Sequence, residues 1–185
     1  MPVQQISPEP ETSAQKAWLL PARLRSKLDQ HPIGKNLYIT EIAFHDEESL
    51  FEKEVLQNNP DYILIYCVSG TGWYKINGKK HVLKANHFVL LPRKTAFMVS
   101  TDPSQPWSLY FVKFNGVLGE DMYLYLLRDD KSELTTPPLV GRIAQFRDIM
   151  HHLGLMENLE NLLYANFRFY SFLGTFRLTV FNYMK

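Results

Sequence analysis

The sequence predicts a mainly β protein, an antiparallel sandwich or barrel, followed by C-terminal α-helices. Short apolar segments alternate with turn residues between positions 37 and 114, at the close spacing typical of antiparallel sandwiches and barrels. After Gly116 the apolar residues recur with a helical period of about 3.6 instead of the strand period of about 2. The length of 185 residues suits one domain, or one domain with an appended element, better than two full domains.

The N-terminal segment differs in composition from the rest of the chain. Residues 1–17 are polar and contain three prolines, which predicts a flexible arm. The apolar cluster Trp18, Leu19 and Leu20 is too short to form an element alone. We expect it to pin the arm onto the protein body, either by simple packing or as a lid over a pocket.

The β region begins with two strong strand signals. Residues 37–44 are rich in β-branched and aromatic residues, and residues 62–68 form the continuous apolar run of a strand covered on both faces. The charged residues 47–57 between them predict a helical turn or a loop. Asn77-Gly78 predicts a type I′ hairpin turn. Further strands are predicted at 73–76, 81–83, 88–91, 97–100 and 107–114.

Three helices are predicted after the strands. Residues 119–128 form a short one, and a second follows Pro137-Pro138 and stops at Gly154. The third runs from about Asn158 almost to the C-terminus and is apolar nearly all round, so we expect one face on the sheet and another against a partner. The apolar stripe of the second helix is Leu139, Ile143, Phe146, Met150 and Leu153, and that of the third is Leu159, Leu162, Leu163, Phe169, Tyr170, Leu173, Phe176 and Val180.

Composition excludes several functions. The formal charge of +1 is far below that of a typical free-standing nucleic-acid binder, so we expect no DNA binding by this chain alone. The single cysteine, Cys67, lies in an apolar run and is expected to be a buried structural thiol. The sequence shows neither a membrane-spanning run nor a signal peptide, which predicts a cytoplasmic protein without membrane contact.

Catalytic signals are weak. Adjacent helical residues such as His151 and His152 point about 100° apart and chelate poorly, and the sequence contains no His-x-His pair on a predicted strand. His81 and His87 lie on neighbouring strand segments, where exposed strand histidines are the simpler interpretation. We therefore expect no catalytic residue, no metal and no cofactor.

Residues 61–116 contain an ordered set of features: the Gly70-Thr71-Gly72 turn, the Asn77-Gly78 hairpin, the apolar run ending in Leu91-Pro92, and Pro106-Trp107 before the last strand. With these features in this order, the segment resembles the ligand-binding domain of AraC-type transcriptional regulators. With its weaker extensions the resemblance covers about 80% of the chain. It implies a cupin-like double-stranded β-helix, or jelly-roll barrel, and a role in sensing an effector for transcription.

The chain departs from the family pattern at several positions. Asn86 replaces a glycine, which is acceptable because both residues tolerate positive φ. Phe97 replaces the histidine that metal-binding cupins use as a ligand, so a metal-dependent cupin enzyme is disfavoured. The positions that correspond to effector contacts in sugar-sensing members are Val99, Leu109 and Phe111, and the family's arginine is replaced near Val55.

The resemblance therefore predicts an effector site inside the barrel. Its expected residues are Phe97, Val99, Leu109, Phe111 and Trp73, with Trp18 in the lid. Because these side chains are apolar, either the effector is not a simple sugar, or the barrel is filled by its own side chains, or polar groups come from elsewhere. Candidates for those polar groups are Thr40, His45, Tyr66, Tyr74 and Tyr110.

The predicted organisation is a flexible arm at 1–17, an effector-binding barrel at 18–135 and a helical dimerisation segment at 136–185. We expect a homodimer whose interface consists of Leu162, Leu163, Phe169, Tyr170, Leu173 and Phe176. The DNA-binding helix-turn-helix domain of such regulators is expected to lie outside this chain, although a standalone protein is an alternative. Two further hypotheses are a small cupin-fold sugar isomerase or epimerase and an interaction domain without a ligand.

Overall fold

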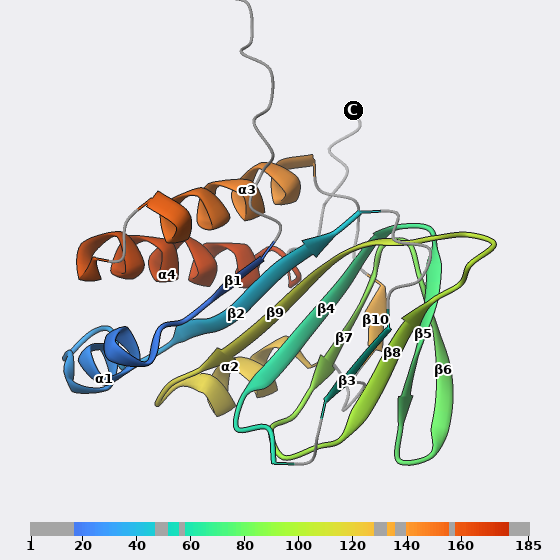
Figure 1. Ribbon diagram of the computed structural model, residues 1–185, viewed down its shortest axis with the longest axis horizontal. Coiled ribbons are helices and arrows are strands. Elements are labelled where there is room, and N and C mark those ends of the chain that lie inside the picture. Colours follow the sequence, from blue (N-terminus) through green and yellow to red (C-terminus); the bar gives the residue numbers. More distant parts are fainter. Residues whose placement is uncertain are drawn as a thin grey trace, which may run out of the picture.

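The computed structural model describes residues 17–46, 52–55, 58–127, 133–135, 140–155 and 158–177. Two antiparallel sheets face each other, and helices cover the outer side of the larger one (Figure 1). The structure confirms the cupin-like fold class predicted from the sequence, although helices hold about as many residues as strands. Residues 1–16 of the arm predicted at 1–17 lie outside the described residues, and Ala17 belongs to β1. The predicted division near residue 135 stays a prediction.

The larger sheet has six strands in the order β1-β2-β9-β4-β7-β10. Its central pairs, β2 with β9 and β9 with β4, run through the apolar segments that gave the strongest strand signals. The strands are β1 (Ala17–Leu19), β2 (Tyr38–His45), β9 (Ser108–Asn115), β4 (Tyr62–Ser69), β7 (His87–Leu91) and β10 (Glu133–Thr135).

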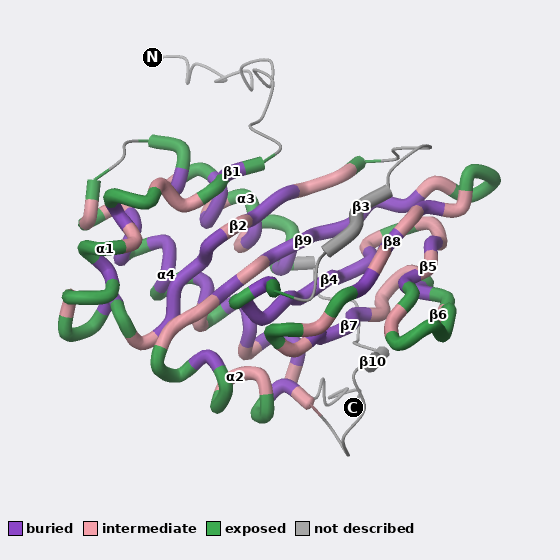
Figure 2. The backbone as a smooth tube through the Cα atoms, turned by 60° about the horizontal axis from the view of Figure 1, so that its bottom comes forward, coloured by how far each residue is buried: buried purple, intermediate pink, exposed green. Residues whose placement is uncertain are grey.

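The smaller sheet has four strands in the order β3-β8-β5-β6. Its hairpin turns at Asn77 and Gly78, whose φ angles of 50° and 77° are those a type I′ turn requires. Figure 2 shows exposed residues along β6 and buried stretches along β2, β9 and β4. The strands are β3 (Glu52–Val55), β8 (Phe97–Thr101), β5 (Thr71–Ile76) and β6 (Lys79–Lys84).

Four helices complete the described fold. Helices α3 and α4 lie side by side and are joined across their surface by the Arg168–Asp148 salt bridge at 2.8 Å (Figure 1). Helix α4 starts after Asn158, whose side chain accepts a hydrogen bond from the backbone N–H of Asn161. The helices are α1 (Ala22–Gln30), α2 (Gly119–Leu126), α3 (Val140–Leu155) and α4 (Leu159–Gly174).

The structure corrects several predicted boundaries. Helix α4 ends at Gly174 rather than near the C-terminus, and residues 178–185 lie outside the described part of the chain. The segment predicted as a helical turn or loop contains β3, because β8 offers it a pairing edge that local sequence does not reveal. Trp18 belongs to a short strand that pairs with β2, so the cluster does form an element with a partner. Helix α3 continues one residue past the predicted stop at Gly154.

The apolar residues form two clusters, one on each side of the six-stranded sheet. The outer cluster lies between this sheet and the helices, where Tyr110 stacks on Phe146 with ring centroids 3.8 Å apart. The inner cluster lies between the two sheets. Because strand residues alternate in direction, each of the strands β2, β9, β4 and β7 contributes to both clusters.

Candidate functional site

The interior between the sheets holds four of the six residues predicted to bind an effector. Phe97 and Val99 of β8 face Leu109 and Phe111 of β9 within one cluster, in which no side chain is more than 4% exposed. The alternation of β8 and β9 places each pair on a common strand face, as the sequence analysis expected. The other members of this inner cluster are Ala43, Ile63, Ile65, Cys67, Tyr74, Leu83, Val89, Leu91 and Trp107.

The two predicted tryptophans lie elsewhere. Trp73 is next to the inward-facing Tyr74 and therefore points to the outer face of the smaller sheet, where the Nζ of Lys80 lies 4.2 Å from its ring centroid. Trp18 belongs to the outer cluster beneath the helices. The structure thus separates Trp18 and Trp73 from Phe97, Val99, Leu109 and Phe111.

A charged pair shares the inner face with these apolar residues. Glu41 of β2 stands directly opposite Lys113 of β9, and their side chains form a salt bridge of 2.8 Å. The neighbouring opposed pair, Ala43 and Phe111, belongs to the inner cluster, so alternation places Glu41 and Lys113 on the same inner face. The sequence signal that could have identified the pair is a single charge within each of two otherwise apolar strands.

The polar groups suggested from the sequence divide between the two faces. Tyr74 lies in the inner cluster and stacks on His81 with ring centroids 4.9 Å apart. Alternation also places His45 on the inner face, since its opposed residue is Leu109. Tyr66 and Tyr110 lie in the outer cluster instead, and Thr40 donates a hydrogen bond to Asp61 at 2.8 Å.

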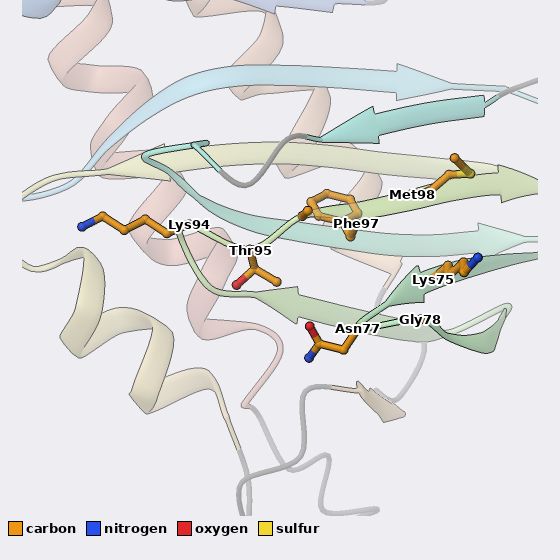
Figure 3. A pocket seen from close by; sticks show the side chains of 8 residues that line it. Lys75, Asn77, Gly78, Lys94, Thr95, Phe97 and Met98 are labelled. Atoms are coloured by element: carbon orange, nitrogen blue, oxygen red, sulfur yellow. The ribbon is translucent and has the colours of Figure 1, made fainter.

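A hollow of about 460 Å³ lies where β5 turns into β6 and where β7 leads into β8. Phe97 belongs both to the lining of this hollow and to the inner cluster, so the hollow and the interior share this residue. Figure 3 shows Lys75 and Lys94 on the rim, extending in opposite directions. The lining residues are Lys75, Asn77, Gly78, Lys94, Thr95, Ala96, Phe97 and Met98.

Register places the hollow and the charged pair at the same end of the barrel. Lys113 is opposite Ile63 of β4, and Ile63 is opposite Leu91, the last residue of β7. The chain then turns toward Phe97, the first residue of β8. We call this end, defined by Glu41, Lys113 and Phe97, the mouth of the barrel.

The chemistry of the interior does not favour nucleophilic or metal catalysis. Burial raises the pKa of the Cys67 thiol to about 12, so the thiol stays protonated and is a poor nucleophile. Phe97 carries no donor atom, and among the described residues no three His, Cys, Asp or Glu side chains are grouped as metal ligands. The expectation of no metal and no cofactor stays a prediction.

The chain itself covers the stripe predicted as a dimer interface. Leu162, Leu163, Phe169, Leu173 and Phe176 are buried in the outer cluster against the sheet and the other helices, and Tyr170 packs against the same cluster. The expectation that one domain alone could not cover this stripe was therefore wrong. On the opposite side of α4, Tyr164 and Phe167 are 44% and 51% exposed.

Comparisons with known proteins agree with this architecture. The family described as AraC-like ligand binding domain matches residues 36–165. The MmsAB operon regulatory protein of Pseudomonas aeruginosa is 25% identical over 101 residues, which are 52% of this chain and 33% of that protein. The chain therefore matches about a third of the regulator's length.

Solved structures with a similar arrangement have low sequence identity. ToxT of Vibrio cholerae gives a TM-score of 0.45 at 14% identity, and the match covers 72% of this chain and 54% of the ToxT chain. A cupin 2 conserved barrel domain protein of Salinispora arenicola gives a TM-score of 0.40 at 13% identity. The match covers 67% of this chain and 98% of that protein's chain. Of the helices that the structure describes, none is long and apolar enough to cross a membrane.

The family match runs from just before β2 into α4 and includes the inner cluster and every described strand except β1. This chain belongs to the family of AraC-like ligand-binding domains.

Proposed function

We propose that this domain senses a small-molecule effector for a transcriptional regulator and binds that effector in the interior between the sheets. The observation that carries the proposal is the position of Phe97, which belongs both to the lining of the hollow at the mouth and to the apolar inner cluster. A ligand that displaces this ring gains access to Val99, Leu109 and Phe111. Each Å² of apolar surface buried there contributes about 25 cal/mol to binding.

The test uses two matched substitutions on opposite faces of the smaller sheet. Val99 is fully buried in the interior, whereas Val82 is 52% exposed on the outer face. A library of metabolites is screened by thermal shift against the wild type, Val99→Phe and Val82→Phe. We expect compounds that stabilise the wild type and Val82→Phe but not Val99→Phe, because the added ring fills the interior.

Folding of the variants is checked by near-UV circular dichroism. If Val99→Phe unfolds, Leu109→Phe repeats the test from the opposite sheet, since Leu109 belongs to the same cluster. Stabilising compounds that bind both Val→Phe variants equally well would contradict an interior site.

We further propose that two copies pair through the helical layer. Tyr164 and Phe167 support this pairing better than the six residues of the predicted interface do, because they are the exposed large apolar residues of α4. Phe167→Asp should weaken the dimer at least about tenfold in analytical ultracentrifugation, while Val82→Asp on the outer face of the smaller sheet, away from the helical layer, should not. A wild-type protein that is monomeric at high micromolar concentration would contradict pairing.

Location in the cytoplasm and DNA reading by a separate domain complete the proposal. The matched regulator is about three times as long as the aligned segment, which leaves room for such a domain in a relative of that kind. The formal charge of this chain is only +1, because 20 Lys and Arg are balanced by 19 Asp and Glu. Such a balance gives little electrostatic attraction to the phosphates of DNA. In a gel-shift assay at physiological salt, sequence-specific DNA binding by this chain alone would contradict this part of the proposal.

A further inference from the structure

The salt bridge between Glu41 and Lys113 is unusual for its surroundings. It lies on the inner face of the six-stranded sheet, two residues along β9 from Asn115, where that strand ends at the mouth. Its neighbours on that face, Ala43, Phe111 and Ile63, belong to the apolar inner cluster. The charges are therefore placed at the border between the mouth and the apolar interior.

Stability alone explains this pair poorly. The side chains of Lys113 and Glu41 are only 18% and 19% exposed, so both charges have lost most of their contact with water. The loss of hydration offsets much of the attraction in such a pair, and apolar residues of similar volume often serve the fold equally well. Polar groups placed at the edge of an apolar site are typical of ligand recognition.

The chemistry of the pair selects the kind of ligand. An ammonium has three N–H donors, and a carboxylate has lone pairs for several hydrogen bonds, so each group can bind a ligand without releasing the other. An anionic ligand would compete with Glu41 for Lys113 and leave an excess negative charge, and a cation would do the reverse. A ligand without net charge keeps the site neutral.

We propose that Glu41 and Lys113 anchor the effector, and that the effector is a net-neutral small molecule with a hydrogen-bond donor and an acceptor on neighbouring carbons. This chemistry is found in the zwitterionic head of an amino acid and in the vicinal diol of a polyol. The Nζ of Lys113 lies 5.9 Å from the ring centroid of Phe111, so the carbon skeleton of a bound molecule continues toward the apolar interior. The proposal rests on the proposed sensing function and deepens it.

The experiment measures thermal shifts with six probes. L-leucine and L-serine represent zwitterions, D-xylose and myo-inositol represent vicinal diols, and butyrate and butylammonium carry a net charge. We expect at least one net-neutral probe to raise the melting temperature of the wild type by about 2 °C or more at saturation. Stabilisation by L-leucine or L-serine would identify an amino acid as the effector class, and stabilisation by D-xylose or myo-inositol would identify a polyol.

Three variants test the anchor itself. Lys113→Met and Glu41→Gln should each weaken binding of the active probe at least about tenfold in calorimetry, whereas Lys84→Met, on the exposed edge strand β6, should not. A single variant leaves the other charge partly buried without its counter-ion and can unfold for that reason. In that case the double variant Glu41→Gln/Lys113→Met removes both charges, and its affinity for the probe is measured in the same way.

Two outcomes would overturn the inference. The first is stabilisation by butyrate or butylammonium alone, or by none of the six probes. The second is unchanged affinity of an active net-neutral probe in the double variant. Either result leaves the sensing function standing if the metabolite screen yields compounds that Val99→Phe excludes.

Discussion

The side-chain oxygen of Asn166 on α4 accepts a hydrogen bond of 3.1 Å from the backbone N–H of Ile39 on β2. The register of β2 against β9 shifts between Ile39 and Glu41, so the helix side chain supplies a partner where the ladder is irregular. Asn166 is only 3% exposed. This bond therefore fixes α4 on the sheet just before the strand reaches the charged pair at the mouth.

Asn166→Leu should lower the free energy of unfolding by about 1–3 kcal/mol, because a buried N–H loses its acceptor. Chemical denaturation with urea measures the change. Asn161→Leu on the same helix is the matched control, since its backbone rather than its side chain contributes to the helix cap. Equal stability of the two variants would show that the Ile39 amide finds another partner.

Gly72 and Trp107 pack so closely that no Cβ fits between them. A Cβ at Gly72 would lie 2.2 Å from carbons of the Trp107 ring, and that ring is fully buried. Gly72→Ala should destabilise the protein by about 1–3 kcal/mol through overpacking. Gly174→Ala is the control, because its Cβ would meet nothing within 4 Å and helix propensity favours alanine.

A double-mutant cycle shows whether this contact is the cause. Trp107→Leu costs stability by itself, but Gly72→Ala should cost less in that background than in the wild type. Additive effects of the two substitutions, measured by urea denaturation, would mean that the strain arises elsewhere.

Arg142 connects three elements from a fully buried position. Its Nε donates to the Oγ1 of Thr175 at 3.0 Å and its guanidinium donates to the Thr175 carbonyl at 2.8 Å, which caps the C-terminal end of α4. The guanidinium also lies 4.7 Å from the ring centroid of Phe176 and 5.4 Å from that of Tyr66 on β4. A cation at this helix end is favoured by the helix dipole.

Arg142→Met should reduce the free energy of unfolding by about 1–3 kcal/mol, because the groups at the end of α4 lose their donors. Faster amide exchange in the last turn of α4 than in its first turn would identify the lost cap. Arg168→Met, which removes only a surface salt bridge to Asp148, should change stability by less than about 1 kcal/mol. A larger loss from Arg168→Met than from Arg142→Met would contradict this assignment.

The sequence predicted the elements whose signal is local. The Asn77-Gly78 turn and the strands on either side of it are formed, and Asn86 has the positive φ of 62° that its replacement of glycine implied. The elements that the sequence missed depend on distant partners. Strand β3 needs the edge of β8, and strand β10 needs the edge of β7.

The candidate site was predictable only in part. The sheet face to which a side chain points was easier to infer than how deeply it is buried or which charged residue it pairs with. Alternation correctly joined Phe97 with Val99 and Leu109 with Phe111. It could not orient Trp73 in a short apolar hairpin, and the salt bridge between Glu41 and Lys113 depends on a register that only the folded sheet fixes. Likewise, the wide stripe of α4 indicated burial but did not reveal that the chain's own sheet provides it.

Cys67 offers a test of how firmly the interior is closed. Burial raises its pKa from 9.0 to about 12, so the folded protein holds the thiol in its neutral form. The stabilisation from this neutral thiol is fully present below pH 9.0 and is lost as the pH rises toward about 12, since the unfolded thiol ionises first. At pH 8, an aromatic disulfide reagent should therefore modify Cys67 only as fast as the protein opens, and urea should accelerate the reaction in parallel with unfolding. Cys67→Ala provides the blank, and rapid modification of the folded wild type would show that reagent enters between the sheets without unfolding.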